Sequence, residues 1–321
     1  MERGLFVMKK VQLYNRQFKE EYLSSLRSAD MVRSDQRFFG YMLNYEAKLD
    51  KDVKDFSVSE ILDAFIGVPL VTAQQYKLGK VSLNRYRNYL RLGEIKLPSN
   101  VEIKQAYIEH GVPQYVLDDK DLYETIMQTT RHSGYDFEFH EMYIALLFML
   151  YYGLSEQECM VLPETFVEDF RLPNGITITN PDIQQFFIEL SKSKGYHIAD
   201  GRQMEYVNSP YLLRLAFYEG RLPKSARKSE GEENCSVVDI LKVKSKYFTQ
   251  YTSKLTIPNI ALAGQMNRAF EDDLRKHDFG VILHYPELQR KYKNGTTNHG
   301  MSIVNEEKYQ LFKAFRLKNN L

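Results

Sequence analysis

Residues 146–162 read LLFMLYYGLSEQECMVL, an apolar run that stops at Gly153 and is followed by a short, partly acidic helical pattern. Apolar residues on nearly all sides predict a buried helix, and about a dozen residues are too few to span a bilayer. Gly153 can end this helix in a left-handed conformation, and Ser155 with Glu158 fits the capping box of a second helix. The stretch therefore predicts a buried helix, a tight turn and a short helix, with Gly153 and Glu158 in structural roles.

The composition indicates a globular protein. The chain has 321 residues, of which 43% are hydrophobic and 13% aromatic, enough for two compact domains. No apolar run is long enough for a membrane span, and the first residues, MERGLFVMKK, lack the pattern of a signal peptide. We therefore expect a cytosolic protein with no membrane contact.

Cofactor and metal motifs are missing from the sequence. It has no Gly-rich phosphate loop, and Cys159 and Cys235 have no partners at metal-ligand spacing. His132, His140 and Glu141 also lack the spacing of ligands on a helix. We expect two reduced thiols, no cofactor and no metal.

Helical patterns fill residues 1–100, which we predict to form an N-terminal helical domain. Residues 9–27 place Val11, Tyr14, Phe18 and Tyr22 near one face, as expected for a core helix. Residues 56–70, FSVSEILDAFIGVPL, begin with serines that can cap a helix before Ile61, Leu62 and Phe65.

The segment SLNRYRNYLRL, residues 82–92, combines a buried stripe with a polar row. Leu83, Tyr86 and Leu90 form the stripe. The polar row has the helical spacing i, i+3, i+4 and i+7 and consists of Asn84, Arg87, Asn88 and Arg91. Amide and guanidinium groups bind base edges and phosphates, so the row is a candidate DNA-binding face; a solvated surface helix is the alternative.

Charge is distributed unevenly, although the net charge is only +1. Acidic residues dominate 115–170, where Lys120 and Arg131 are the basic exceptions. Two other stretches are basic, 77–96 and 214–254, and a bipolar molecule of this kind can present one face to a polyanion. The further candidates for DNA contact are Lys77, Lys80 and Asn259 and, more weakly, Lys242, Lys244, Lys246 and Arg268.

A linker and a second domain follow the basic stretch. Pro98, Gly111 and Pro113 interrupt the helical pattern, so we predict a linker at 101–116 and a domain at 117–321. Within that domain, the Pro-Asn-Gly sequence of RLPNGITITN, residues 171–180, predicts a small β-hairpin.

The turn at Gly153 resembles the catalytic domain of the tyrosine recombinase, or phage integrase, family. In that family a buried helix ends in Gly-Leu-Arg-x-Ser-Glu-x-x-x-Leu, and a small hairpin follows. The scaffold positions match here, but Ser155 stands where the family has a catalytic arginine. The family's Pro-His-x-Leu-Arg motif would fall on Pro258, with Asn259 at the histidine position and Leu262 at the second arginine position.

The resemblance implies a mainly α, two-domain clamp, with a helical core-binding-like N-terminal domain and a mostly helical, inactive catalytic-like domain with a small β-hairpin. In the family's DNA-cleavage reaction, two arginines neutralise the charge of the DNA phosphate while a tyrosine attacks it. The loss of one such arginine lowers the rate by about 10²-fold or more. The family nucleophile would be Tyr285, Tyr292 or Tyr309, and the spacing does not select one. We therefore expect no enzymatic activity.

These losses imply that the protein is a DNA-binding repressor of a phage or prophage. It would act in the bacterial cytoplasm, associated with the nucleoid. Its partners would be double-stranded operator sites and an anti-repressor protein. Two alternatives remain open: a divergent recombinase using Arg268, Arg275 and a late tyrosine, and a protein-interaction scaffold. Residues 300–320 predict a C-terminal helix that either docks within the chain or exchanges between protomers, so the sequence leaves monomer and homo-oligomer open.

Overall fold

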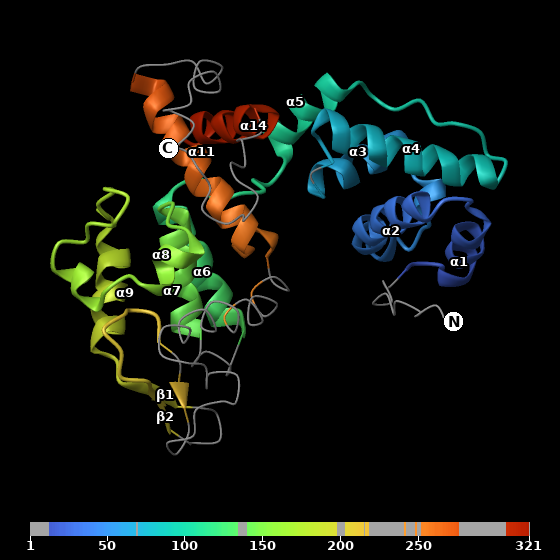
Figure 1. Ribbon diagram of the computed structural model, residues 1–321. Helices are drawn as coiled ribbons and strands as arrows, with labels where there is room; N and C mark the ends of the chain where they lie inside the picture. Colours follow the sequence, from blue (N-terminus) through green and yellow to red (C-terminus); the bar gives the residue numbers. More distant parts are fainter. Residues whose placement is uncertain are drawn as a thin grey trace. The chain divides into compact units, whose positions relative to one another are not determined.

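The computed structural model describes residues 13–68, 70–133, 140–197, 203–214, 216–217, 241, 248, 252–275 and 306–320. The chain divides into two compact units, Met1–Val112 and Pro113–Leu321, called unit 1 and unit 2 below. Both are built mainly from helices, and a small antiparallel sheet belongs to unit 2 (Figure 1). The predicted mainly helical class with a small β element is confirmed.

Unit 1 is helical throughout its described part. Its elements are α1 (Arg16–Ser25), α2 (Ala29–Leu49), the short 3-10 helix η1 (Val53–Asp55), α3 (Val58–Gly67), α4 (Ala73–Tyr89) and α5 (Asn100–His110). Helices α2, α3, α4 and α5 each begin with a polar residue whose side chain accepts a hydrogen bond from a first-turn amide. In that order, the capping residues are Ser28, Ser57, Thr72 and Ser99. Ser57 forms a complete capping box with Glu60, which confirms the predicted serine cap.

Helix α5 occupies most of the segment in which we expected a linker. Ser99 and Glu102 close a capping box at its start, and Ile103 and Tyr107 are buried where the helix packs on α3. Pro98 and Gly111 therefore flank a helix instead of marking an extended connection. The division between the units lies after Val112.

An aromatic cluster forms the core of unit 1. Tyr22, Phe39 and Tyr86, from α1, α2 and α4, meet with ring centroids 5.0–5.9 Å apart. Edge-to-face and tilted pairs of this kind contribute about 0.5–1.5 kcal/mol each beyond their buried area. The cluster joins three helices, and the expected burial of Tyr22 and Tyr86 is confirmed.

The position of Phe18 in the core was predicted wrongly. Phe18 is 62% exposed, and the buried residues of α1 are Lys19, Tyr22 and Leu23. This i, i+3, i+4 set shares Tyr22 with the predicted face but has Lys19 in place of Phe18. Lys19 occupies the core because a buried carboxylate lies opposite it on α2.

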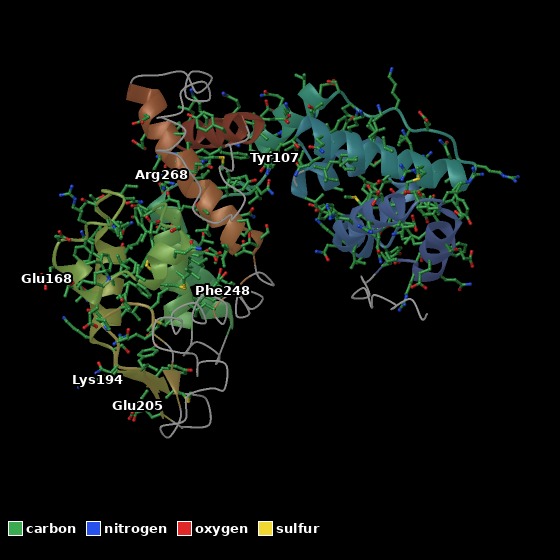
Figure 2. All side chains as sticks on the ribbon, in the orientation of Figure 1. Tyr107, Glu168, Lys194, Glu205, Phe248 and Arg268 are labelled. Carbon is green, nitrogen blue, oxygen red and sulfur yellow. The ribbon has the colours of Figure 1, made fainter. Side chains whose placement is uncertain are left out.

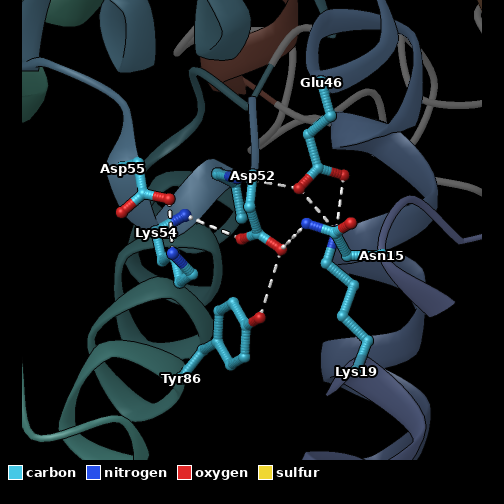
Figure 3. A network of polar contacts seen from close by, with 8 residues as sticks. Asn15, Lys19, Glu46, Asp52, Lys54, Asp55 and Tyr86 are labelled. Atoms are coloured by element: carbon cyan, nitrogen blue, oxygen red, sulfur yellow. Dashed lines mark hydrogen bonds and ion pairs between the residues drawn. The ribbon is translucent and has the colours of Figure 1, made fainter. Parts of the chain in front are cut away.

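Figure 3 shows the polar network around this lysine. The Lys19 ammonium lies 2.5 Å from the Glu46 carboxylate, and both side chains are 0% exposed. Glu46 also accepts a hydrogen bond of 2.8 Å from the backbone amide of Val53. Asp52 accepts hydrogen bonds from Asn15 at 3.3 Å and from the Tyr86 hydroxyl at 3.2 Å. The network thus connects α1, α2, η1 and α4.

Asp35 is another buried carboxylate of unit 1. It is 0% exposed and accepts hydrogen bonds from the hydroxyls of Tyr22 and Ser82. The Arg85 guanidinium lies 2.8 Å from it. Arg85 is therefore neutralised within the unit and adds little to the positive surface of the basic stretch 77–96.

Unit 2 surrounds a helix that is almost completely buried. Between Met142 and Tyr151, every side chain is 2% exposed or less, which confirms the buried helix predicted from the sequence. The helical elements of the unit are α6 (Asp119–Ser133), α7 (His140–Tyr151), α8 (Glu156–Met160), η3 (Glu164–Glu168), α9 (Pro181–Lys192), η5 (Ser253–Leu255), α11 (Ile257–Arg275) and α14 (Glu306–Lys318).

Helix α11 approaches the end of α7 at Gly264. A Cβ atom at Gly264 would lie 1.8 Å from the carbonyl oxygen of Tyr151. At this distance only glycine fits between the two helices. The C-terminal helix α14 packs on α11, with Phe312 against Phe270 at a ring separation of 6.5 Å. Within unit 2, α14 therefore docks on its own chain.

The β structure of unit 2 is small. Strands β1 (Gly195–His197), β2 (Gln203–Tyr206) and β3 (Ala216–Phe217) form an antiparallel sheet in the order β1-β2-β3. The predicted Pro-Asn-Gly turn is present, with Gly175 at φ 83°, but its strands are reduced to one bridge between Arg171 and Thr177. In the described ranges, no helix is long and apolar enough to cross a membrane.

Candidate functional site

The polar row predicted on α4 does not form one exposed face. Asn84 is 8% exposed, and its side-chain oxygen accepts a 3.2 Å hydrogen bond from the backbone amide of Ile95. The Arg87 guanidinium donates to the carbonyl oxygens of Lys54 and, at 3.1 Å, of Gly93. Both side chains hold the segment after α4 against the helix. The prediction that Asn84 reads a base edge is therefore wrong, and Arg87 has an internal role.

The other members of the basic stretch remain on the surface. Lys77, Lys80 and Asn88 are exposed on α4, and Arg91 is exposed just after the helix ends. Arg91 has φ 56°, so the chain turns sharply at this residue. These side chains form the candidate DNA-binding surface of unit 1, and we call them the α4 basic surface.

The turn at Gly153 has the predicted geometry. Gly153 has φ 89°, and the amide of Leu154 donates to the carbonyl oxygen of Met149 at 3.1 Å, as in a Schellman motif. Ser155 begins α8 with a complete capping box: its amide donates to Glu158 at 2.7 Å, and its hydroxyl accepts from the Glu158 amide at 3.2 Å. The structural roles predicted for Gly153, Ser155 and Glu158 are confirmed.

A cavity of about 800 Å3 lies beside this turn within unit 2. Its walls come from the start of α6, the end of α7, the Gly153 turn, the turn at Asn174 and one face of α11. The α11 face consists of Gly264, Asn267, Arg268 and Glu271, at the helical spacing i, i+3, i+4 and i+7. The cavity therefore occupies the place that the family resemblance assigns to the catalytic arginine.

Arg268 is the basic residue that lines the cavity. It donates a 2.6 Å hydrogen bond to the Tyr151 carbonyl, and it lies so close to Gly153 that an added Cβ would be 2.9 Å from the guanidinium. Burial lowers the pKa of Arg268 to about 10, so the group stays charged at neutral pH. Figure 2 labels this residue on α11. Its role is internal to unit 2, whereas we had predicted it as a weaker DNA contact.

Arg316 reaches the same region from α14. Its guanidinium donates to the Asn267 side chain, lies 3.5 Å from the Glu271 carboxylate and stacks over Phe270 at 4.4 Å. Sequence reasoning missed both this residue and the face of α11. The i, i+3, i+4, i+7 spacing of that face was visible, but nothing local distinguished it from a surface stripe.

The two other positions compared with the family motif lie away from the cavity. The Asn259 side chain donates to the Ser253 carbonyl at 2.7 Å, so it holds the start of α11 to η5. Leu262 is partly exposed on the same helix, and neither residue lines the cavity. The structure thus brings Ser155 together with Arg268, and not with Asn259 or Leu262.

Several candidates fall outside the described residues, namely Lys242, Lys244, Lys246, Tyr285, Tyr292, Cys235 and the side chains of Arg275, His132 and His140. Tyr309 lies on α14, is 0% exposed and does not line the cavity. Cys159 is a buried free thiol in α8. No metal-binding group of His, Cys, Asp and Glu occurs in the part of the chain that the structure describes.

The comparisons with known proteins concern unit 1. Residues 13–91 match the family model of the MrpR N-terminal core-binding domain. The match begins just before α1, ends at Arg91 and includes the whole of α4, so it covers the α4 basic surface. Over these residues the chain is therefore similar to a core-binding domain. No curated protein matches the chain.

Gly153→Glu is expected to lower the melting temperature of unit 2. A non-glycine residue at φ 89° costs roughly 1–2 kcal/mol, and its Cβ would press against Arg268. The measurement is thermal unfolding followed by circular dichroism. Gly175→Glu is the control, because Gly175 lies in the same unit and also has positive φ but has nothing within 4 Å of its Cβ position. Equal effects of the two substitutions would contradict a role of the Arg268 contact.

Proposed function

We propose that this protein is a sequence-specific DNA-binding transcriptional repressor of a phage or prophage, acting in lysogeny on operator sites in double-stranded DNA. In this role it would resemble the master repressor of SP-beta-type prophages and work in the cytoplasm of the bacterial host, at the nucleoid. The core-binding match over 13–91 and the exposed α4 basic surface support binding to DNA. An anti-repressor protein is the proposed partner that would relieve repression.

One observation carries the choice of a repressor over a DNA-cutting enzyme. Ser155, at the position of the family's catalytic arginine, is fully used as a helix cap with Glu158. A serine hydroxyl and a neighbouring carboxylate cannot neutralise the charge of a phosphate under attack. The proposal is therefore a protein that binds DNA without cleaving it.

A divergent tyrosine recombinase is the second candidate, and Arg268 is the observation that favours it. This guanidinium lines the cavity beside Ser155 and has no carboxylate as ion-pair partner in the described part of the chain. It would replace the family's catalytic arginine if one of the candidate tyrosines near the C-terminus reached the same cavity. The experiment below separates the two functions.

Selection of genomic fragments of the phage and its host by the purified full-length protein tests the repressor directly. We expect recovery of a discrete, repeated site and, on a suicide substrate containing that site, no covalent protein–DNA complex. Phe substitutions of Tyr285, Tyr292 and Tyr309 should leave binding unchanged. A covalent complex that disappears with one of them would establish the recombinase instead, and recovery of random fragments would contradict operator recognition.

Removing charge from the α4 basic surface should weaken DNA binding through phosphate contacts. For the variant Lys77→Ala/Lys80→Ala/Arg91→Ala, each lost phosphate contact should reduce the log–log salt slope by about 0.9. The measurement is a titration with operator DNA at several salt concentrations. Arg37→Ala is a matched control, because Arg37 is exposed on α2. An unchanged slope in the triple variant would show that this surface does not touch DNA.

Asn88→Ala distinguishes base reading from phosphate binding. If the exposed Asn88 amide reads an adenine edge, its loss should relax preference at one base pair by about 1–3 kcal/mol, with little change in the salt slope. Binding is measured with single-base operator variants. A uniform loss on all of them would assign Asn88 to the DNA backbone.

A further inference from the structure

The exposed side of α4 carries polar and apolar side chains in one row. Its members are exposed and follow one another at the spacing i, i+3, i+7 and i+14, so they share one face of the helix. They are Gln74, Lys77, Val81 and Asn88, and we call them the α4 outer row. The buried residues of α4 lie on other faces of the helix, so a molecule that binds along α4 would meet this row first.

The two amide side chains of the α4 outer row are available to a ligand. Neither Gln74 nor Asn88 has a side-chain hydrogen bond to any described residue, whereas Gln75 and Asn84 on the same helix are both hydrogen-bonded within the unit. A free amide offers a donor and an acceptor side by side. This pattern is complementary to the N6 and N7 atoms that adenine presents in the major groove of DNA.

Val81 is an apolar residue in the middle of this polar row. It is 42% exposed. Lys77 and Arg85 flank it one turn away on either side, and Gln74 and Asn88 flank it two turns away. An exposed valine by itself needs no explanation. Between two free amides and beside a lysine, however, it has the setting in which an apolar side chain contacts the 5-methyl group of thymine.

Charge favours DNA over a second copy of the chain as the molecule that covers this row. Helix α4 contains no acidic residue, and Lys77 and Lys80 have no ion-pair partner in the described part of the chain. A two-fold contact between two copies would bring the same patch of each copy together, and with it the same lysines. A polyanion instead neutralises them.

We propose that the α4 outer row reads A·T base pairs in the major groove, with Val81 against the 5-methyl group of a thymine and Gln74 on the N6 and N7 atoms of an adenine. This inference rests on the proposed function, and it adds which base pairs the protein selects. Seven residues separate the two side chains, a rise of about 10.5 Å along the helix, which corresponds to about three base pairs. The two A·T pairs should therefore lie about three base pairs apart in the operator.

Chemically altered bases in the DNA test both contacts. The full-length protein first selects a site from a library of random duplexes, and each thymine of that site is then replaced in turn by uracil, which removes only the 5-methyl group. We expect one position at which the affinity falls about fourfold, the effect of one buried methyl group. About three base pairs away, 7-deazaadenine in place of adenine removes N7 and should lower the affinity about fivefold or more.

Substitutions in the protein assign these effects to the two side chains. Val81→Ser should bind the thymine site and the uracil site with equal affinity, and Gln74→Ala should lose the sensitivity to 7-deazaadenine. Both residues are exposed, so the fold should be preserved. Val58→Ser is the matched control, because Val58 is 41% exposed on α3 of the same unit. This variant should keep the full preference for thymine.

The possible outcomes separate this inference from the proposed function. A discrete selected site with no uracil-sensitive position, or with a thymine preference that Val81→Ser retains, would overturn the inference and leave operator binding intact. Selection without a discrete site would contradict both. If Val81→Ser changed the oligomeric state in sedimentation while uracil had no effect, the row would be a contact between protein copies, and the inference would again be overturned.

Discussion

Lys19→Met is expected to destabilise unit 1 by about 3–5 kcal/mol, because it leaves the Glu46 carboxylate buried without its cation. Both side chains are 0% exposed and 2.5 Å apart. The Lys19 ammonium also lies 4.8 Å from the centre of the Phe39 ring, a cation–π contact that the substitution removes as well. The measurement is hydrogen exchange of α1 and α2 amides in the full chain, which reports this unit separately from unit 2.

The pH dependence of this variant gives an independent check. Burial raises the pKa of Glu46 even with Lys19 present, and removal of the ammonium should raise it further. A carboxyl group whose pKa is higher in the folded state than in the unfolded state makes the fold less stable as the pH rises. The stability falls across the pH range between the unfolded-state pKa and the folded-state pKa. The loss in Lys19→Met should therefore be smaller at pH 5 than at pH 8.

Two further variants separate the charge effect from loss of packing. Lys19→Met/Glu46→Gln removes both charges and keeps an oxygen for the Val53 amide, so it should recover most of the stability. Lys48→Met, at an exposed position of α2, should change stability by about 0.5 kcal/mol or less. If the double variant were as unstable as Lys19→Met, an unpaired buried charge would not be the cause.

Gly264→Ala should disrupt the packing of α11 on α7 and cost about 3 kcal/mol or more. The added Cβ would lie 1.8 Å from the Tyr151 carbonyl oxygen, a backbone atom that cannot rotate away. The helices must therefore separate, which also disturbs the hydrogen bond from Arg268 to the same oxygen. Overpacking at well-packed sites usually costs about 1–3 kcal/mol, and contact with backbone places this case at or above that range.

Gly175→Ala is the control for Gly264→Ala. Gly175 has φ 83° but no atom within 4 Å of its Cβ position, so the substitution should cost only the roughly 1–2 kcal/mol of left-handed backbone strain. Both variants are compared by urea unfolding and by hydrogen exchange in α7 and α11. A smaller effect of Gly264→Ala than of Gly175→Ala would contradict the close approach of the two helices.

Local chemistry in the sequence was sufficient for the features that depend on neighbouring residues. The buried helix before Gly153, the left-handed glycine and the Ser155 cap were all predicted, because apolar periodicity, φ preference and capping depend on a few adjacent positions. The same holds for the cap at Ser57 and for the mainly helical class. The resemblance to the recombinase family at the Gly153 turn likewise used only contiguous residues.

Tertiary structure decided which polar side chains face inward. Helical periodicity placed Phe18 in the core, but the face of α1 that packs carries Lys19, because Glu46 lies opposite it on another helix. Asn84 and Arg87 are on the polar side of α4 by spacing, yet the segment after the helix folds back and takes their hydrogen bonds. Arg268 meets the Tyr151 carbonyl across more than a hundred residues of chain. Periodicity gives the direction of a side chain on its own helix, whereas burial and pairing depend on the distant segment that covers it.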